Sequence, residues 1–128
     1  GGDAMLIRPQ DETTALLEWV KTVWTYDPQT GEFRWLPQPV TEFEPSHNMT
    51  ARRNMARWNG SFAGSLAGTA KPDKPRVLTR KGMVFKAERV AVALTIDAWP
   101  NGTVRFVDRD PSNLLRANLT YVEGIWTR

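Results

Sequence analysis

The sequence contains no cysteine and only one histidine, His47. The absence of cysteine excludes disulfides, thiolate zinc sites and a cysteine nucleophile. A single histidine excludes a two-histidine metal site and a histidine pair for acid–base chemistry. No apolar run reaches the roughly 18 residues that a membrane span needs, and no basic segment followed by an apolar one marks a secretory signal. We therefore expect no membrane partner, no bound metal, no cofactor and a cytoplasmic location.

The length and composition are those of one globular domain. The chain has 128 residues, of which 41% are hydrophobic and 24% are charged. These values are ordinary for a domain that buries its own core. The first four residues, GGDA, precede Met5, and we interpret residues 1–4 as a cloning remnant. Residues 5–128 are then expected to form a single domain.

The N-terminal part predicts a helix and then a β-hairpin. Apolar residues recur at helical spacing over residues 12–24, which indicates a helix with one buried face. Residues 26–35 (YDPQTGEFRW) contain turn formers, followed by the alternation typical of a half-buried strand. Residues 37–75 are rich in Pro, Gly, Ser, Asn and Arg, and predict an irregular stretch with one short helix near residues 50–58. The expected anchors of this stretch are Trp58, Phe62 and Leu66.

The C-terminal part predicts a second hairpin, a helix and a strand. Residues 77–79 and 83–85 flank an Arg-Lys-Gly turn, and glycine is favoured in hairpin turns. Residues 86–97 follow as a helix with one apolar face. Residues 104–107 predict a short strand before a turn. Helices mixed with antiparallel hairpins indicate an α+β fold.

Charge is distributed unevenly along the chain. The net charge is +3, but residues 1–51 hold three basic and eight acidic residues, whereas residues 52–89 hold ten basic and two acidic ones. Residues 90–128 hold four of each sign. The basic segment predicts one positive face that binds phosphate, and a solvated loop surface explains its charges equally well. Its basic residues are Arg52, Arg53, Arg57, Lys71, Lys74, Arg76, Arg80, Lys81, Lys86 and Arg89.

Several segments, in the same order as in the family, resemble HNH endonucleases of the phage and homing type. The matching segments are residues 26–35 (YDPQTGEFRW), 58–68 (WNGSFAGSLAG), 85–91 (FKAERVA), 99–100 (WP) and 105–119 (RFVDRDPSNLLRANL). Each motif alone is weak, but an ordered series is specific. The resemblance covers about residues 12–122, and it implies a strand–strand–helix finger of the HNH kind.

The positions that carry catalysis in the family are changed in this sequence. The resemblance implies a metal-binding Asp and a general-base His at positions occupied here by Arg105 and Phe106. Arginine cannot bind a cation, and phenylalanine cannot accept a proton. A further family histidine is Glu88 here, and the family's metal ligand after the position of Asn118 has no counterpart in the sequence. We therefore expect no enzyme activity, with Glu88, Arg105, Phe106 and Asn118 as degenerate positions.

The other polar residues of these motifs are expected to be structural. Asn113 and Asn118 hold a loop in the family, and the resemblance implies the same role here. Asp108 and Asp110 lie in a predicted turn, where Asp readily hydrogen-bonds the backbone. Glu88 begins a predicted helix, and its expected ion-pair partner is one of its basic neighbours.

The sequence thus predicts a catalytically inactive, HNH-like phage protein that binds the phosphate backbone of DNA through its basic segment. One alternative is a phage-encoded inhibitor that binds a host protein through exposed tryptophans, since Trp is frequent in interface hot spots. A second alternative is an active metal-dependent nuclease in which carboxylates hold Mg²⁺ and His47 is the base. The expected location is the cytoplasm of an infected bacterial host, and the oligomeric state stays open.

Overall fold

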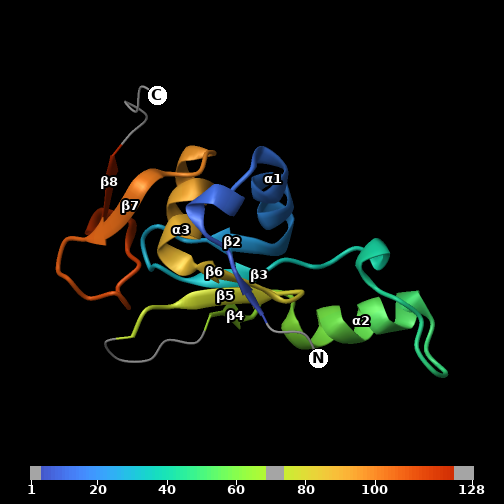
Figure 1. Ribbon diagram of the computed structural model, residues 1–128. Helices are drawn as coiled ribbons and strands as arrows, with labels where there is room; N and C mark the ends of the chain where they lie inside the picture. The colour runs from blue at the N-terminus through green and yellow to red at the C-terminus, as the bar shows by residue number, and fades with distance from the viewer. Residues whose placement is uncertain (1–3, 69–73, 123–128) are drawn as a thin grey trace.

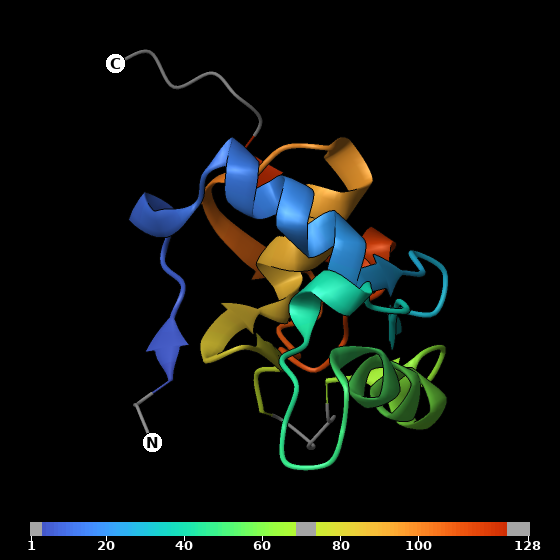
Figure 2. The same cartoon turned by 90° about the vertical axis from the view of Figure 1, so that its right-hand side faces the viewer.

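The computed structural model describes residues 4–68 and 74–122 and shows a small α+β domain, as the sequence predicts (Figure 1). The helices α1 (Thr14–Val23) and α3 (Ala87–Ile96) lie together over two small sheets. Helix α2 (Ala51–Phe62) extends to one side, away from the other two helices (Figure 1, Figure 2). In the described part of the chain, no helix has the length and apolar character needed to cross a membrane.

Helix α1 forms where the apolar spacing predicts a helix. Thr13 caps it, because its side-chain oxygen accepts a hydrogen bond from the Leu16 amide at 3.0 Å. This bond satisfies one of the amides that the first turn leaves without a helical partner. The helix ends at Val23, because Trp24 has extended backbone and enters a strand. Its buried residues are Leu17, Val20 and Val23.

The first predicted hairpin is confirmed and belongs to a three-stranded sheet. Strand β2 (Trp24–Tyr26) pairs antiparallel with β3 (Phe33–Trp35). Strand β4 (Leu66–Ala67), which the sequence does not predict, pairs with the other edge of β3. The turn contains Gly31 at a φ of +76°, where an added Cβ would lie 2.8 Å from the carbonyl carbon of Leu114. Glycine is therefore required there by both backbone conformation and space.

The second predicted hairpin is also confirmed. Strands β5 (Val77–Arg80) and β6 (Met83–Lys86) pair antiparallel, and Lys81 and Gly82 form the turn with positive φ angles. Strand β1 (Met5–Leu6) lies parallel to β6. The sequence does not predict this third strand, because two residues show no periodicity and their partner is far away in the chain.

Helix α3 follows β6 directly and is buried on most of its circumference rather than on one face. The surrounding core contains Trp24, whose ring centroid lies 5.5 Å from that of Phe85 on β6 and 5.5 Å from that of Trp35 on β3. These aromatic contacts join the two sheets beneath the helices. Leu78 and Phe33 are buried in the same core.

Strands β7 (Asn101–Phe106) and β8 (Leu119–Val122) form a third, antiparallel sheet. The strand predicted at residues 104–107 therefore begins three residues earlier and ends one residue earlier. A loop and a short 3-10 helix (Arg116–Asn118) connect the two strands. This sheet lies at the opposite end of the molecule from α2 (Figure 1).

Helix α2 is longer than the helix predicted near residues 50–58, and none of its residues is buried. Two of the three expected anchors are wrong, because the side chains of Phe62 and Leu66 are 44% and 54% exposed. Trp58 packs inward, with its ring centroid 5.5 Å from that of Trp35. The helix carries few other apolar side chains, so it does not enter the core. The contacts of Trp58 and a pair of hydrogen bonds between Asn59 and Gln38 hold it against the rest of the molecule.

Candidate nucleic-acid interface

Three of the ten basic residues lie together on α2. Thr50 caps the helix by accepting a hydrogen bond from the Arg53 amide at 3.1 Å, and the helix then presents Arg52, Arg53 and Arg57. All three residues are exposed. Among the described residues, the ion pairs are formed by other side chains. These three guanidinium groups are therefore available to an external anion.

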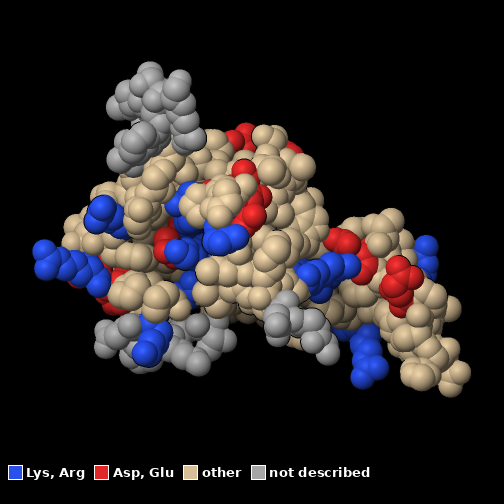
Figure 3. Space-filling view, in the orientation of Figure 1, with Lys and Arg blue, Asp and Glu red and all other residues tan. Residues whose placement is uncertain are grey.

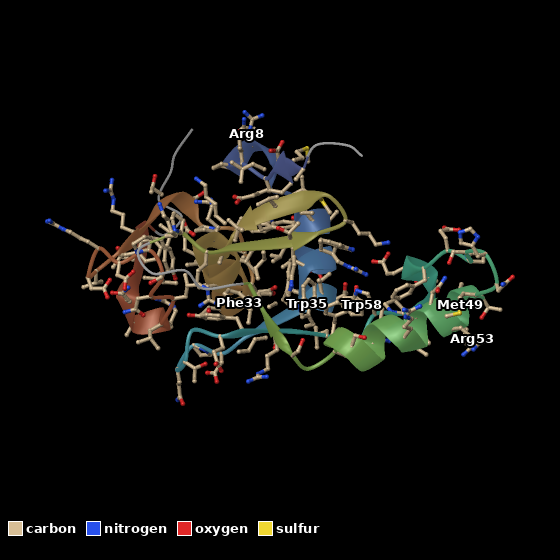
Figure 4. All side chains as sticks on the ribbon, turned by 90° about the horizontal axis from the view of Figure 1, so that it is seen from below. Arg8, Phe33, Trp35, Met49, Arg53 and Trp58 are labelled. Atoms are coloured by element: carbon tan, nitrogen blue, oxygen red, sulfur yellow. The ribbon has the colours of Figure 1, made fainter. Side chains whose placement is uncertain are left out.

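The spacing of the three arginines places them on one broad side of α2. Residues three or four apart are neighbours on a helix surface, so Arg53 and Arg57 project in nearly the same direction. Arg52 lies next to Arg53 around the helix. Figure 4 shows Phe33, Trp35 and Trp58 in a row from the body of the molecule toward α2, with Arg53 at the far end of that row.

The tip of the β5–β6 hairpin contacts α2 through Arg80 and the 3-10 helix Val40–Glu42 through Lys81. The guanidinium carbon of Arg80 lies 4.6 Å from the ring centroid of Trp58, a cation–π contact. The Lys81 ammonium lies 3.1 Å from a carboxylate oxygen of Glu42 and donates to the Glu42 carbonyl at 2.9 Å. A hydrogen bond from Trp19, followed by the Lys81 contact, lowers the pKa of the Glu42 carboxyl. Both basic residues therefore fasten the hairpin tip rather than stand free.

Three further basic residues lie at the other end of the same hairpin. Lys86 is opposite Val77 in the β5–β6 pairing, and Lys74 and Lys86 are both exposed. Arg76 is half-buried and donates to the Gly68 carbonyl at 3.1 Å. The strands between the two ends are four residues long, which separates the ends by roughly 10 Å at 3.3 Å per residue. Lys71 lies outside the described residues.

Arg89 faces the interior of the molecule. It is 6% exposed and forms two hydrogen bonds with the Glu12 carboxylate, at 2.6 and 2.8 Å. Its Nη1 donates to the Gly102 carbonyl at 2.7 Å, and Nη2, which also donates to Glu12, donates to the Pro100 carbonyl at 2.8 Å. Every polar contact of this guanidinium is therefore internal, and we leave Arg89 out of the candidate interface.

The predicted basic face is therefore divided in space. On the face drawn in Figure 3, Lys and Arg side chains lie at both ends of the molecule and between them, with Asp and Glu side chains interspersed. They form no continuous patch on that face. Lys74 and Lys86 are also exposed and outside the ion pairs of the described residues, but α2 carries three such basic residues on one element.

Three of the four degenerate catalytic positions, Arg105, Phe106 and Asn118, lie at the other end of the molecule, in and after β7. Arg105 is exposed and Phe106 packs against the core. Both oxygens of Asp108 accept internal hydrogen bonds, from Asn118 and the Asp110 amide on one and from Asn113 on the other. These bonds lower the pKa of Asp108.

The loop roles expected for the asparagines and aspartates are confirmed. The Asn118 side chain is buried, accepts from the Asp108 amide at 3.0 Å and donates to the Asn113 carbonyl at 2.9 Å. Asp110 accepts from the amide and the hydroxyl of Ser112 at 2.9 and 2.6 Å. The described residues contain no group of three or more His, Cys, Asp or Glu side chains placed to hold a metal ion.

Glu88 lies in the first turn of α3 and does not form the predicted ion pair. Lys86 is exposed, and Arg89 is paired with Glu12 instead. One carboxylate oxygen of Glu88 is buried without a hydrogen-bond partner, and burial raises the pKa of this carboxyl. Glu88 lines a hollow of about 190 Å³ beside β7. His47, the base of the nuclease alternative, is exposed in a tight turn with a φ of 46°.

A second hollow, of about 310 Å³, lies beside α2. It is lined by Phe43, Asn54, Arg57, Trp58, Ser61 and Phe62. This hollow is not predicted from the sequence, because the helix expected near residues 50–58 ends too early to place Ser61 and Phe62 on the face of Trp58. A helix extended to Phe62 would have grouped residues 54, 58, 61 and 62 on one side.

Comparisons with protein-family models, with curated proteins and with solved structures give no match for this chain. The resemblance to HNH endonucleases therefore stays a prediction from the sequence motifs.

Proposed function

We propose that this protein binds nucleic acid without cutting it, chiefly through the phosphate backbone and the arginines of α2. The observation that carries this proposal is the exposure of Arg52, Arg53 and Arg57 on one helix without a carboxylate partner in the described residues. The chain between Glu44 and Asp73 contains no acidic residue at all. Arginine forms paired hydrogen bonds to phosphate, so three such groups on one helix suit a polyanion.

The placement of the other basic residues supports a narrower surface than the whole basic segment. Arg80 and Lys81 hold the hairpin tip against the region of α2, so their charges add to the local field without being the main contacts. Lys74 and Lys86 are exposed about one hairpin length away. A long nucleic acid that lies on α2 can reach them, whereas a short one cannot.

The absence of catalysis in this proposal rests on the residues at the HNH positions. Arg105 and Phe106 supply neither a metal ligand nor a base. Asp108, two residues after Phe106, already uses both oxygens as acceptors for neighbouring amides. The phage origin and the cytoplasm of an infected host remain parts of the proposal that rest on the motif resemblance.

A second candidate function is binding to a host protein. The observation that favours it is the exposure of two large apolar side chains, Phe62, which packs on the half-buried Trp58, and Leu66 on β4. The five described tryptophans are buried or half-buried, so the described residues do not supply the exposed tryptophans expected for this alternative. Exposed apolar groups of this kind occur at protein interfaces. The same region carries the three unpaired arginines, which favours a polyanionic partner over an apolar one.

A binding measurement with two charge-matched variants tests the proposed function. Fluorescence anisotropy at low salt would compare the parent, the R52A/R53A/R57A variant and a control, R8A/R105A/R109N, on labelled single-stranded and duplex oligonucleotides. The control removes three exposed arginines outside α2, and Asn is chosen at residue 109 because its φ is 63°. We expect the α2 variant to bind roughly tenfold or more weakly and the control to bind nearly as the parent does. Equal loss in both variants, or no binding by the parent, would refute the proposal.

A further inference from the structure

We propose that the hollow beside α2 receives one unpaired base of a single-stranded nucleic acid. This inference rests on the proposed function. It adds that the hollow binds one part of the nucleic acid, a base with an aromatic face. The phosphate groups on either side of that base would then lie near the arginines of α2. Arg57 is one of the residues that line the hollow, so the hollow adjoins the arginines of α2.

Three aromatic rings give the hollow its chemical character. The ring centroids of Trp58 and Phe62 are 5.0 Å apart, and those of Phe43 and Trp58 are 6.3 Å apart. Phe62 is 44% exposed, so one aromatic surface is open to solvent beside two others. Bases stack on such rings with little regard to sequence, because every base has a π-face.

The central ring of the hollow is held in place by the rest of the molecule. Trp35 meets Trp58 edge to face, with centroids 5.5 Å apart and an interplanar angle of 89°. Arg80, at 4.6 Å, provides a cation–π contact from the hairpin tip. A preformed aromatic surface loses less conformational freedom when a ligand binds.

Polar groups at the rim suit a nucleotide better than an apolar peptide. The amide nitrogen of Asn54 donates to the Glu44 carbonyl at 2.8 Å and to the Ser46 hydroxyl at 3.2 Å, which fixes the orientation of this amide. Its oxygen accepts no hydrogen bond from the described residues. This oxygen and the Ser61 hydroxyl can therefore hydrogen-bond to the edge of a base. No carboxylate lines the hollow, whereas a guanidinium does, so the rim attracts an anion.

The size of the hollow limits its occupant. A volume of about 310 Å³ is at the small end of the range for ligand pockets, about 300–1,000 Å³. This volume is sufficient for one flat base. A base within a duplex is paired and stacked, and it must be extruded before it can enter such a site. The hollow therefore predicts that unpaired strands bind more tightly than phosphate contacts alone would allow.

An abasic strand separates this inference from the proposed function, because it carries the phosphates without the bases. The probes are a 12-nucleotide deoxyuridine strand, the equivalent uridine strand, which differs from it only in the sugar, and an abasic strand of the same length. The parent should bind at least one base-bearing strand roughly 5- to 150-fold more tightly than the abasic strand, the range expected for one stacked base. The sugar of the tighter strand identifies DNA or RNA as the source.

Variants at Phe62 test whether the aromatic ring produces that preference. Phe62→Ala and Phe62→Leu should both lower the ratio of the affinity for the base-bearing strand to that for the abasic strand toward one. Phe62→Trp should retain this ratio. Leu keeps the apolar volume and lacks the π-face, so it separates stacking from simple burial. Leu115→Ala, at another exposed apolar residue, is the control and should keep the ratio of the parent.

The possible failures are distinguishable. If the parent binds the abasic strand as tightly as both base-bearing strands, or if Phe62→Leu keeps the full ratio, the base site is refuted and phosphate binding stands. If the parent binds none of the three strands at low salt, the proposed function fails, and the base site fails with it.

Discussion

At the scale of single residues, a few side-chain hydrogen bonds set the path of the loop between β7 and β8. Asn118 bridges the Asp108 side chain and amide to the Asn113 carbonyl. The motif resemblance predicts these loop roles correctly, because the hydrogen-bonding chemistry of Asn and Asp is local. A carboxylate whose oxygens are used by neighbouring amides is also poorly placed to bind a cation, which links the loop to the absence of catalysis that we propose.

Gly31 provides a residue-scale prediction about stability. Its φ of +76° is unfavourable for other residues, and a Cβ there would lie 2.8 Å from the backbone of Leu114. Gly31→Ala should therefore destabilise the protein by about 2 kcal/mol or more. The matched control is Gly60→Ala, since Gly60 lies within α2 and an added Cβ would meet nothing within 4 Å.

Urea unfolding measures both glycine variants. Gly60→Ala should stabilise the protein by about 0.5–1 kcal/mol, because alanine loses less backbone freedom in a helix than glycine. Equal free energies of unfolding for Gly31→Ala and the parent would contradict the close approach between the first hairpin and Leu114.

Glu88 gives a prediction with a defined pH dependence. Burial raises the pKa of this carboxyl in the folded protein, so its ionised form disfavours folding. That penalty is absent below the unfolded pKa, about 4, and is fully present above the raised folded pKa. Glu88→Gln should therefore raise the melting temperature at pH 7, with a gain that disappears as the pH falls below about 4.

The control for this pH series is Glu18→Gln, which changes an exposed carboxylate on α1. Its melting temperature should stay close to that of the parent at pH 7. A gain for Glu88→Gln that is independent of pH would show that the burial of the charged carboxylate is not its cause.

At the scale of elements, the buried pair of Glu12 and Arg89 joins three parts of the fold. Glu12 follows the N-terminal 3-10 helix (Pro9–Asp11), Arg89 lies on α3, and the carbonyls that Arg89 also reaches belong to the start of β7 and the residue before it. The side chains of the pair are 5% and 7% exposed. The partners are 77 residues apart in the chain, so charge counting along the sequence placed Arg89 in the basic segment without revealing its partner.

Breaking this pair should be costly, because it leaves a buried charge without its partner. Glu12→Ala should destabilise the protein by about 3–5 kcal/mol. Lys21→Ala is the control, since its partners Glu18 and Asp97 are exposed and ion pairs at the surface contribute little to stability. Similar losses for the two variants in a denaturant titration would mean that the Glu12–Arg89 pair does not hold the elements together.

Elements with a strong local pattern are predictable from the sequence, and those defined by distant partners are not. Helices α1 and α3 and the two hairpins follow apolar spacing and turn residues. Strands β1 and β4 have two residues each and exist through their pairing partners. Helix α2 has too few apolar residues for periodicity to show its full length, so the hollow beside it could not be predicted either.

At the scale of the whole molecule, the positions of the basic residues decide the binding of an anion more than the net charge does. The net charge is only +3, and the basic segment divides into an exposed group on α2, an engaged hairpin tip, a distant pair of lysines and a buried arginine. Sequence clustering predicted one positive face, but ion pairs and burial decide which charges remain available. We expect the electrostatic field of the α2 arginines to govern association with a polyanion.

The proposed lack of catalysis predicts that the purified protein leaves plasmid DNA intact with Mg²⁺ or Mn²⁺. Metal-assisted hydrolysis needs metal ligands and a base, and Arg105 and Phe106 supply neither of these. An agarose-gel assay over several hours is the measurement. Metal-dependent nicking that disappears in Asp108→Ala would instead support the rearranged nuclease.

The dependence of duplex DNA affinity on salt tests the central proposal most directly. If Arg52, Arg53 and Arg57 each neutralise one phosphate, their combined removal should flatten the slope of log affinity against log salt by about 2.7, at roughly 0.9 per contact. The R8A/R105A/R109N control should keep the slope of the parent. A parent affinity that hardly changes with salt, or an α2 variant with the parent's slope, would contradict phosphate binding by α2 and favour the host-protein alternative.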